Sequence, residues 1–286
     1  MPELPEVEIV KQSLEKSILY KKINKVLVKN RNLRFKVEKN LNKFISKKKI
    51  LKVLRRSKYI ILNFHKNQFL LIHFGMSGTL HLVRNNNSKK TNLSFYHSIN
   101  LPQKHNHIVI FFNNFKLVYN DPRRFGYFKF FKNLDTLNYY FSNLGLEVLD
   151  KRLNLNYLKK VIKNKNKNIK NFLLDQKYIA GIGNIYANEI LYYSKINPYK
   201  NVNKLNYLEL KKIIYFSKLV IKKAIKKGGS SIKDFKNIRG KSGLFQNEFK
   251  VYNRENKKCL NKTCLEKIIK VFISNRSSYF CKNCQK

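Results

Sequence analysis

The chain has 286 residues, of which 43% are hydrophobic, so it is long enough for one large domain or two ordinary domains with real cores. It has neither a secretion signal nor an apolar run near the roughly 18–20 residues that cross a bilayer, so we expect a cytoplasmic protein with no membrane association. The formal charge of +45 predicts a nucleic-acid partner. A lysine-rich chain without Trp is also typical of an A/T-rich genome, so a solvated basic surface with no dedicated partner stays an alternative.

The opening stretch, MPELPEVEIV, predicts the start of an amphipathic helix over residues 4–19. Proline and carboxylates suit a first helical turn, and apolar residues recur at helical spacing, namely Val7, Val10, Leu14 and Ile18. A second interpretation depends on removal of Met1, which would give Pro2 a secondary α-amine with a pKa near 8. Such an amine can attack a sugar C1′, and the iminium formed promotes elimination of the attached phosphates, with Glu3 as a proton donor.

Short β-rich runs fill residues 23–131 and predict an antiparallel sandwich or barrel. Residues 83–106 are long, polar and poorly periodic, so we expect an exposed connection there. The stretch NDPRRFGYF lies between two of the expected strands. Its arginines could pair with bases or phosphates and its Phe125 could fill the gap left by an unstacked base, or the segment could be an ordinary turn.

Helical periodicity takes over beyond residue 132, most clearly at 153–164, 184–196 and 207–228. A loop punctuated by glycine and serine follows at 228–243. The stretch AGIGN, just before the helix at 184, could hold a phosphate at a helix N-terminus or could be a tight turn. It lacks the third glycine and the βαβ setting of a dinucleotide site.

All four cysteines lie near the C-terminus in a C-x4-C and a C-x2-C pair, separated by strand-like segments: Cys259, Cys264, Cys281 and Cys284. A β-hairpin presents four thiolates in this way to one tetrahedral Zn²⁺. Because sulfur takes every position, we expect a structural metal and not a catalytic one.

Together these stretches resemble one family along nearly the whole chain, the bacterial formamidopyrimidine-DNA glycosylases, which excise oxidised purines such as 8-oxoguanine and formamidopyrimidines. The resemblance rests on MPELPEVE, RRSKYIIL, HFGMSG, KHNH, DPRRFG, LLDQKYIAGIGNIYANEIL, GGSSIKDF and the cysteine tail. It implies an α+β fold with two domains, an N-terminal antiparallel β-sandwich with flanking helices and a helix-two-turn-helix domain with a zinc-binding β-hairpin. The expected divisions are a catalytic domain over 1–131, a DNA-binding domain over 132–249 that contains a lesion-covering loop at 228–245, and the zinc finger over 250–286.

The resemblance also implies a monomer that acts on damaged double-stranded DNA in base excision repair. It assigns a role to individual residues. Pro2 would displace the damaged base and form a Schiff base, and Glu3 would protonate the sugar as its ring opens. Lys58 would act in β-elimination and Arg276 in δ-elimination, both beside phosphates. Supporting carboxylates and DNA contacts are implied for a further set: Glu6 and Glu189 in the active site, His105, Lys165 and Asn184 on the backbone, and Met76, Arg123 and Phe125 in the void left by the flipped nucleotide.

One departure from the family concerns the first cysteine pair, which the family usually spaces as C-x2-C. Here Asn261 stands where the usual first ligand would fall, and we expect Cys259 to serve through a widened knuckle. Two other functions stay open as alternatives. One is a related glycosylase for oxidised pyrimidines, resembling endonuclease VIII, whose members tend to have glycine after the first Pro-Glu pair where this chain has Leu4. The other is a non-catalytic, zinc-containing DNA-binding protein.

Overall fold

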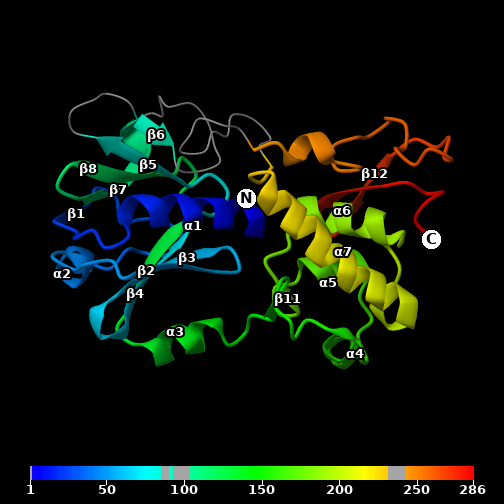
Figure 1. Cartoon of the computed structure of the whole chain (residues 1–286), viewed down its shortest axis with the longest axis horizontal. Coiled ribbons are helices and arrows are strands. Elements are labelled where there is room, and N and C mark those ends of the chain that lie inside the picture. The colour runs from blue at the N-terminus through cyan, green and yellow to red at the C-terminus, as the bar shows by residue number, and fades with distance from the viewer. Residues whose placement is uncertain (1, 85–89, 93–102, 231–242) are drawn as a thin grey trace. The chain divides into compact units, whose positions relative to one another are not determined.

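The computed structural model describes residues 2–84, 90–92, 103–230 and 243–286 (Figure 1). The chain forms two compact units. The first comprises residues 1–142 and 227–244, and the second comprises 143–226 and 245–286. The expected domain boundaries after residues 131 and 249 stay predictions. In the structure, helix α3 (Leu134–Phe141) belongs to the first unit, because Leu137 packs on a sheet of that unit.

Two antiparallel sheets form the first unit, as predicted. One has the strand order β1-β7-β8-β5-β6 and the other β2-β3-β4-β9. The bounds of the nine strands are β1 Lys25–Val28, β2 Lys52–Arg56, β3 Tyr59–Phe64, β4 Gln68–His73, β5 Thr79–Arg84, β6 Lys90–Asn92, β7 Asn106–Phe111, β8 Phe115–Asn120 and β9 Tyr127–Phe131. Most of the exposed connection expected over 83–106 lies outside the described residues, but Lys90–Asn92 within it forms strand β6 and pairs with β5, which the sequence did not predict. A run of three residues is too short for a period-2 pattern to reveal.

The core of the first unit lies between the two sheets. Alternate residues of each strand point into it, as the pleat requires, for example Leu80 and Leu82 from one sheet and Leu70 and Ile72 from the other. Helix α1 (Leu4–Ile18) closes this core with the four apolar residues that the sequence pattern singled out, all at most 1% exposed. A short helix, α2 (Leu41–Ile45), adds Leu41 and Ile45 to the same core. The predicted helix and sandwich are therefore confirmed.

Helices dominate the second unit (Figure 1). They are α4 (Leu155–Ile162), α5 (Ile169–Leu174), α6 (Asn184–Ser194) and α7 (Tyr207–Lys226), accompanied by a two-stranded parallel sheet of β10 (Leu146–Glu147) and β11 (Ile179–Ala180). Asparagine side chains cap helix starts, because an Asx oxygen accepts one of the otherwise unpaired N–H groups. Asn154 accepts from Tyr157 N–H and Asn168 from Asn171 N–H. Helix α6 is the centre of the unit, with eight of its residues buried.

The cysteine-bearing tail forms the predicted hairpin, with strands β12 (Ile269–Ile273) and β13 (Arg276–Phe280). Ser274 and Asn275 turn the chain at positive φ angles of 48° and 58°, the geometry of a two-residue hairpin turn. Among the described residues no helix is both long and apolar enough to span a membrane. The glycine- and serine-rich loop expected at 228–243 lies outside the described residues from 231 to 242.

Candidate functional site

The first residues of the chain are buried and fixed by a carboxylate. Pro2 is buried, and Glu3 is 3% exposed and caps the start of α1. The Glu6 carboxylate accepts from Glu3 N–H through Oε2 at 2.9 Å. Its Oε1 accepts from both the backbone N–H and the hydroxyl of Ser230, each at 2.9 Å. The Glu6 carboxylate thus holds the residue next to Pro2 and also links the start of α1 to Ser230, a partner that the sequence did not predict.

Lys58 lies in the turn between β2 and β3 and is 6% exposed. The preceding residue, Ser57, has a positive φ of 54°, so the turn is tight. Arg55 holds this turn to α1, because its Nε donates to the Glu8 carboxylate at 2.7 Å and its Nη1 donates to the Ser57 carbonyl at 3.0 Å. The structure therefore fixes Lys58 and the N-terminal helix to each other through a partly buried ion pair.

His73, at the end of β4, lies within the electrostatic reach of Lys58. Burial first, and then the positive charges of Lys58 and Arg34, together lower the pKa of His73 to about 4. The ring accepts from Gly75 N–H through Nδ1 at 3.1 Å, which requires a neutral imidazole with its proton on the other nitrogen. The lysine is therefore flanked by an aromatic ring that is uncharged at neutral pH.

Two neighbouring turns of the first unit carry the apolar and arginine side chains predicted to fill a DNA void. Met76, in the turn between β4 and β5, is 43% exposed, and Phe125, in the turn between β8 and β9, is 38% exposed. The Arg123 guanidinium lies over the Phe125 ring at 4.6 Å from its centroid. Exposure at this level leaves both apolar side chains available to enter a ligand. His105, in the short helical turn Gln103–His105, accepts through its carbonyl from Asp121 N–H at 3.0 Å.

In the second unit, Asn184 lies close to Arg276 because it bonds to Ser277, the residue after Arg276. Asn184 is the first residue of α6, preceded by Gly183, and its side-chain amide donates to the Ser277 carbonyl at 2.9 Å. Arg276 is exposed and opens β13 directly before Ser277. Lys170, 0% exposed, donates to the same Ser277 carbonyl at 2.9 Å and to the Ser278 hydroxyl. This buried ammonium, which the sequence did not single out, holds β13 to α5, while Asn184 holds it to α6. Lys165, also predicted to bind DNA, is exposed in the turn after α4.

Glu189 was predicted as a supporting carboxylate, and its contacts lie with the segment that leads to the cysteines. It is 0% exposed on α6, and it accepts from three consecutive backbone N–H groups, those of residues 250, 251 and 252, at 2.8–3.0 Å. Burial raises the pKa of its carboxyl, and the three N–H donors oppose that rise. A role for Glu189 in the active site stays a prediction, while its contacts here anchor the cysteine-bearing segment.

The four cysteines converge, with all their sulfurs within 4.8 Å of one another. The sulfurs of Cys259 and Cys284 are 3.8 Å apart and those of Cys264 and Cys281 are 3.6 Å apart. A tetrahedral ion with bonds of about 2.3 Å to sulfur requires sulfur–sulfur distances of about 3.8 Å, so the cluster fits a metal ion. The widened first knuckle does bring Cys259 into the cluster.

Asn261 occupies the extra space of that knuckle. Its backbone N–H points to the Cys259 sulfur at 3.5 Å, and its side-chain amide points to the Cys284 sulfur at 3.3 Å. Its carbonyl accepts from Cys264 N–H at 3.0 Å, which closes a turn that takes up the two additional residues. N–H groups aimed at thiolates offset their negative charge, as outer ligands of metal sites do.

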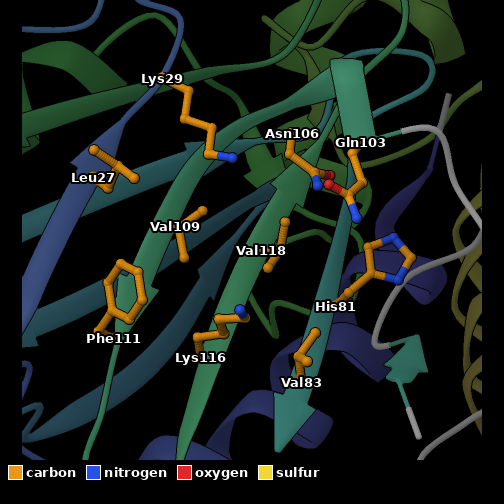
Figure 2. Close-up of a pocket in the computed structure, with 10 residues that line it drawn as sticks. All are labelled: Leu27, Lys29, His81, Val83, Gln103, Asn106, Val109, Phe111, Lys116 and Val118. Atoms are coloured by element: carbon orange, nitrogen blue, oxygen red, sulfur yellow. The ribbon is translucent and has the colours of Figure 1, made fainter. Parts of the chain in front are cut away.

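A separate pocket of about 240 Å³ lies on the outer face of the five-stranded sheet (Figure 2). Val109, Val118 and Phe111 contribute apolar side chains to it, and Lys29 and Lys116 approach from its rim. None of the residues predicted for catalysis, DNA binding or metal binding lines this pocket.

Comparisons with known proteins agree along the whole chain. A family model described as the formamidopyrimidine-DNA glycosylase N-terminal domain matches residues 1–128, and a model described as the H2TH domain of the same enzyme matches residues 144–236. Relatives named formamidopyrimidine-DNA glycosylase include one from Rickettsia bellii, 42% identical, and one from a Wolbachia of Culex pipiens, 39% identical, each alignment covering 100% of both chains.

Similar solved structures include complexes of a Lactococcus lactis protein called Fpg with DNA. A mutant bound to DNA containing Fapy-dG has a TM-score of 0.87 at 30% identity over 100% of both chains. The same protein bound to DNA with an abasic site has a TM-score of 0.84 at 30% identity, covering 99% of both chains. The wild-type protein bound to DNA with an oxidised pyrimidine has a TM-score of 0.85 at 30% identity over 100% of both chains.

Proposed function

The chain belongs to the formamidopyrimidine-DNA glycosylase family, and on that premise we propose that this DNA glycosylase of base excision repair excises oxidised purines from duplex DNA through a Schiff base on Pro2. The observation that carries the proposal is the burial of Pro2 next to Glu3, whose backbone N–H donates to the Glu6 carboxylate. A fixed N-terminus provides the pre-organisation that a terminal-amine nucleophile needs. The partner is damaged double-stranded DNA, bound by a monomer in the bacterial cytoplasm.

The first chemical step uses the amine of Pro2 after removal of Met1. The nitrogen lone pair attacks C1′ of the damaged nucleotide, and the bond from C1′ to the base breaks with the electron pair leaving on the base. The proton that the proline nitrogen carries after the attack passes to the departing base, which leaves neutral and frees the nitrogen lone pair. Glu3 donates a proton to the sugar ring oxygen as the ring opens. The proline nitrogen then holds an iminium with C1′, which has no N–H to lose and stays positively charged.

The iminium makes the C2′ proton acidic, so strand cleavage follows by two eliminations. Loss of that proton expels the 3′ phosphate, and a second elimination expels the 5′ phosphate. Lys58 serves the first elimination and the phosphate beside the lesion, while Arg276 binds phosphate and assists the second. Buried Lys58 is fixed to α1 through Arg55 and Glu8, which supports its place beside the N-terminal amine.

The remaining predicted residues bind DNA without reacting. Met76, Arg123 and Phe125 replace the extruded nucleotide, with Arg123 facing the orphaned cytosine, and their exposure and shared position support this role. His105, Lys165 and Asn184 contact the phosphate backbone. Glu6 supports the active site.

We also propose that one Zn²⁺ is bound by Cys259, Cys264, Cys281 and Cys284. The distances between sulfurs suit a tetrahedral thiolate site, and a site filled by four protein ligands has a structural role. The ion would hold the hairpin that carries Arg276 and would take no part in the chemistry.

Borohydride trapping tests the catalytic proposal. Processed protein and duplex DNA with 8-oxoguanine opposite cytosine should give a covalent adduct on the N-terminal peptide. P2G should excise the base much more slowly, give far less adduct and keep its duplex binding. Protein that retains Met1 provides the matched control and should also fail to form the adduct. A full-strength adduct from P2G would contradict the role of Pro2. Parallel duplexes with an oxidised pyrimidine test substrate class, and faster excision there would favour the endonuclease VIII-like alternative.

A further inference from the structure

Asp121 is a buried acid that joins two turns of the first unit. It is 0% exposed and follows directly after β8. One carboxylate oxygen, Oδ1, accepts from the Ser77 hydroxyl in the turn between β4 and β5. The other, Oδ2, accepts from Gly126 N–H at 2.8 Å and from the Tyr119 hydroxyl at 2.9 Å. The carboxylate therefore links the turn over 74–78 with the turn over 121–126.

The two turns also touch through their backbones. A Cβ atom added to Gly75 would lie 2.4 Å from the backbone carbon of Phe125 and 2.5 Å from Gly126 N. Ser77 Oγ accepts from Arg123 N–H at 3.3 Å, which adds a second link to the one through the carboxylate. The turns are thus packed as one body, and nothing larger than glycine fits at their contact.

Each turn carries part of the void-filling set, which is the group of side chains proposed to occupy the space left by the flipped nucleotide. The first holds Met76 and the second holds Arg123 and Phe125, and all three point their side chains outward while Asp121 lies beneath them. Because Ser77 directly follows Met76, the bond from Ser77 to Asp121 sets where Met76 stands relative to Arg123. Burial and the adjacent carboxylate raise the pKa of Tyr119 well above its ordinary value, so its hydroxyl remains a donor to Asp121.

We propose that Asp121 is a positioning residue that couples the void-filling side chains of the two turns through Ser77, so that discrimination of the base opposite the lesion depends on this buried link. The inference rests on the proposed function, because it assigns Asp121 to the same DNA-reading step. Charge-assisted hydrogen bonds are short, directional and strong, which suits a device that holds two flexible turns in one fixed geometry.

The test measures single-turnover excision of 8-oxoguanine opposite cytosine and opposite adenine. S77A removes the link from the first turn, and we expect its preference for cytosine to fall about tenfold, the effect of losing one hydrogen bond to a charged group. D121N keeps the side-chain volume but replaces one acceptor oxygen with an amide, and it should reduce the preference in the same direction. Asp121 is fully buried and cannot touch DNA, so this second variant separates positioning from a direct contact by Ser77.

Y119F is the matched control, because it removes another hydrogen bond to the same carboxylate without cutting the link between the turns. It should lower the melting temperature and leave the preference for cytosine unchanged. A double-mutant cycle adds a readout that a merely structural role would not move. In an M76A background, S77A should change the preference less than twofold, because Ser77 acts through Met76.

Three results would overturn the proposal: additive effects of S77A and M76A, an unchanged preference in D121N, or an equal loss in Y119F. Cleavage of single-stranded DNA with a preformed abasic site distinguishes the two proposals, since no void has to be filled there. S77A should cleave this substrate at the wild-type rate, and an equal loss on it would refute a role confined to the turns. If the wild-type protein forms no borohydride adduct on either substrate, the proposed function fails instead.

Discussion

At the scale of single residues, the partly buried imidazole of His73 shows how the candidate site constrains protonation. The folded protein keeps the pKa of this group at about 4, against 6.5 for a free side chain, with burial first and the charge of Lys58 second. Because the folded state binds the proton less tightly than the unfolded state, acidification between about pH 6.5 and 4 favours unfolding. Above this window the group has no effect on stability.

We expect this single group to remove about 2 kcal/mol of unfolding free energy between pH 7 and pH 5. H73N keeps an acceptor for Gly75 N–H but cannot titrate, so its stability should fall less over that range. H65Q, which removes an exposed imidazole, is the control and should follow the wild-type curve. Urea unfolding at the two pH values measures the difference, and identical losses in wild type and H73N would contradict the assignment.

Glu6 is a second residue whose chemistry cannot be replaced by its amide. Both oxygens of its carboxylate accept from N–H or O–H donors. In glutamine an NH₂ group replaces one of these oxygens, so this NH₂ would face another donor and the hydrogen bond there would be lost. We expect E6Q to lose about 2 kcal/mol of stability from a buried donor left unsatisfied, together with most of its borohydride adduct. E15Q removes a half-exposed carboxylate of the same helix and should alter neither. An E6Q protein as stable and active as wild type would show that the contacts with Ser230 do not matter.

At the scale of elements, the sequence predicted those with a strong period and missed those held by long-range contacts. Regular apolar spacing or turn residues mark the helix at residues 4–18, the sandwich strands, the helices from 184 and 207 and the cysteine-bearing hairpin. Strand β6 and the two-residue strands β10 and β11 have no such pattern, because they exist through pairing with distant partners.

The same reason separates the predicted site residues from the missed ones. Pro2, Lys58 and Arg123 belong to motifs that can be read locally. Ser230 and Lys170 gain their meaning from partners 224 and 107 residues away in the sequence, as hydrogen bonds to Glu6 and to Ser277. A single sequence without an alignment contains no local signal for such pairs.

The widened knuckle gives a prediction at the level of one element. C259S should lower zinc content to well below one ion per chain, because the site would lose one of four thiolates. K262A changes an exposed residue of the same knuckle and should bind one equivalent. Metal analysis of both proteins after dialysis gives the result. Unchanged zinc in C259S would mean that Cys259 is not a ligand.

At the scale of the whole molecule, the charge of +45 predicts affinity for DNA that falls steeply with salt. R276A and K165A should each reduce the slope of log affinity against log salt by about 1, since each removes one phosphate contact and the counterion released with it. K39A removes an exposed lysine outside the predicted contacts and should leave the slope for specific binding unchanged. Titrations of duplex DNA at four salt concentrations test this, and equal slopes for all variants would count against the two contacts.

The path of the chain through its two units has a consequence for synthesis. The first unit contains residues 1–142, but its last segment, 227–244, is made only after the four helices of the second unit. During translation the Glu6 carboxylate therefore cannot bond to Ser230 until about four-fifths of the chain has left the ribosome. The first unit stays incomplete until then. A nascent chain that stops short of this segment would lack the Ser230 donors to Glu6, so the proposed active site is completed only near the end of synthesis.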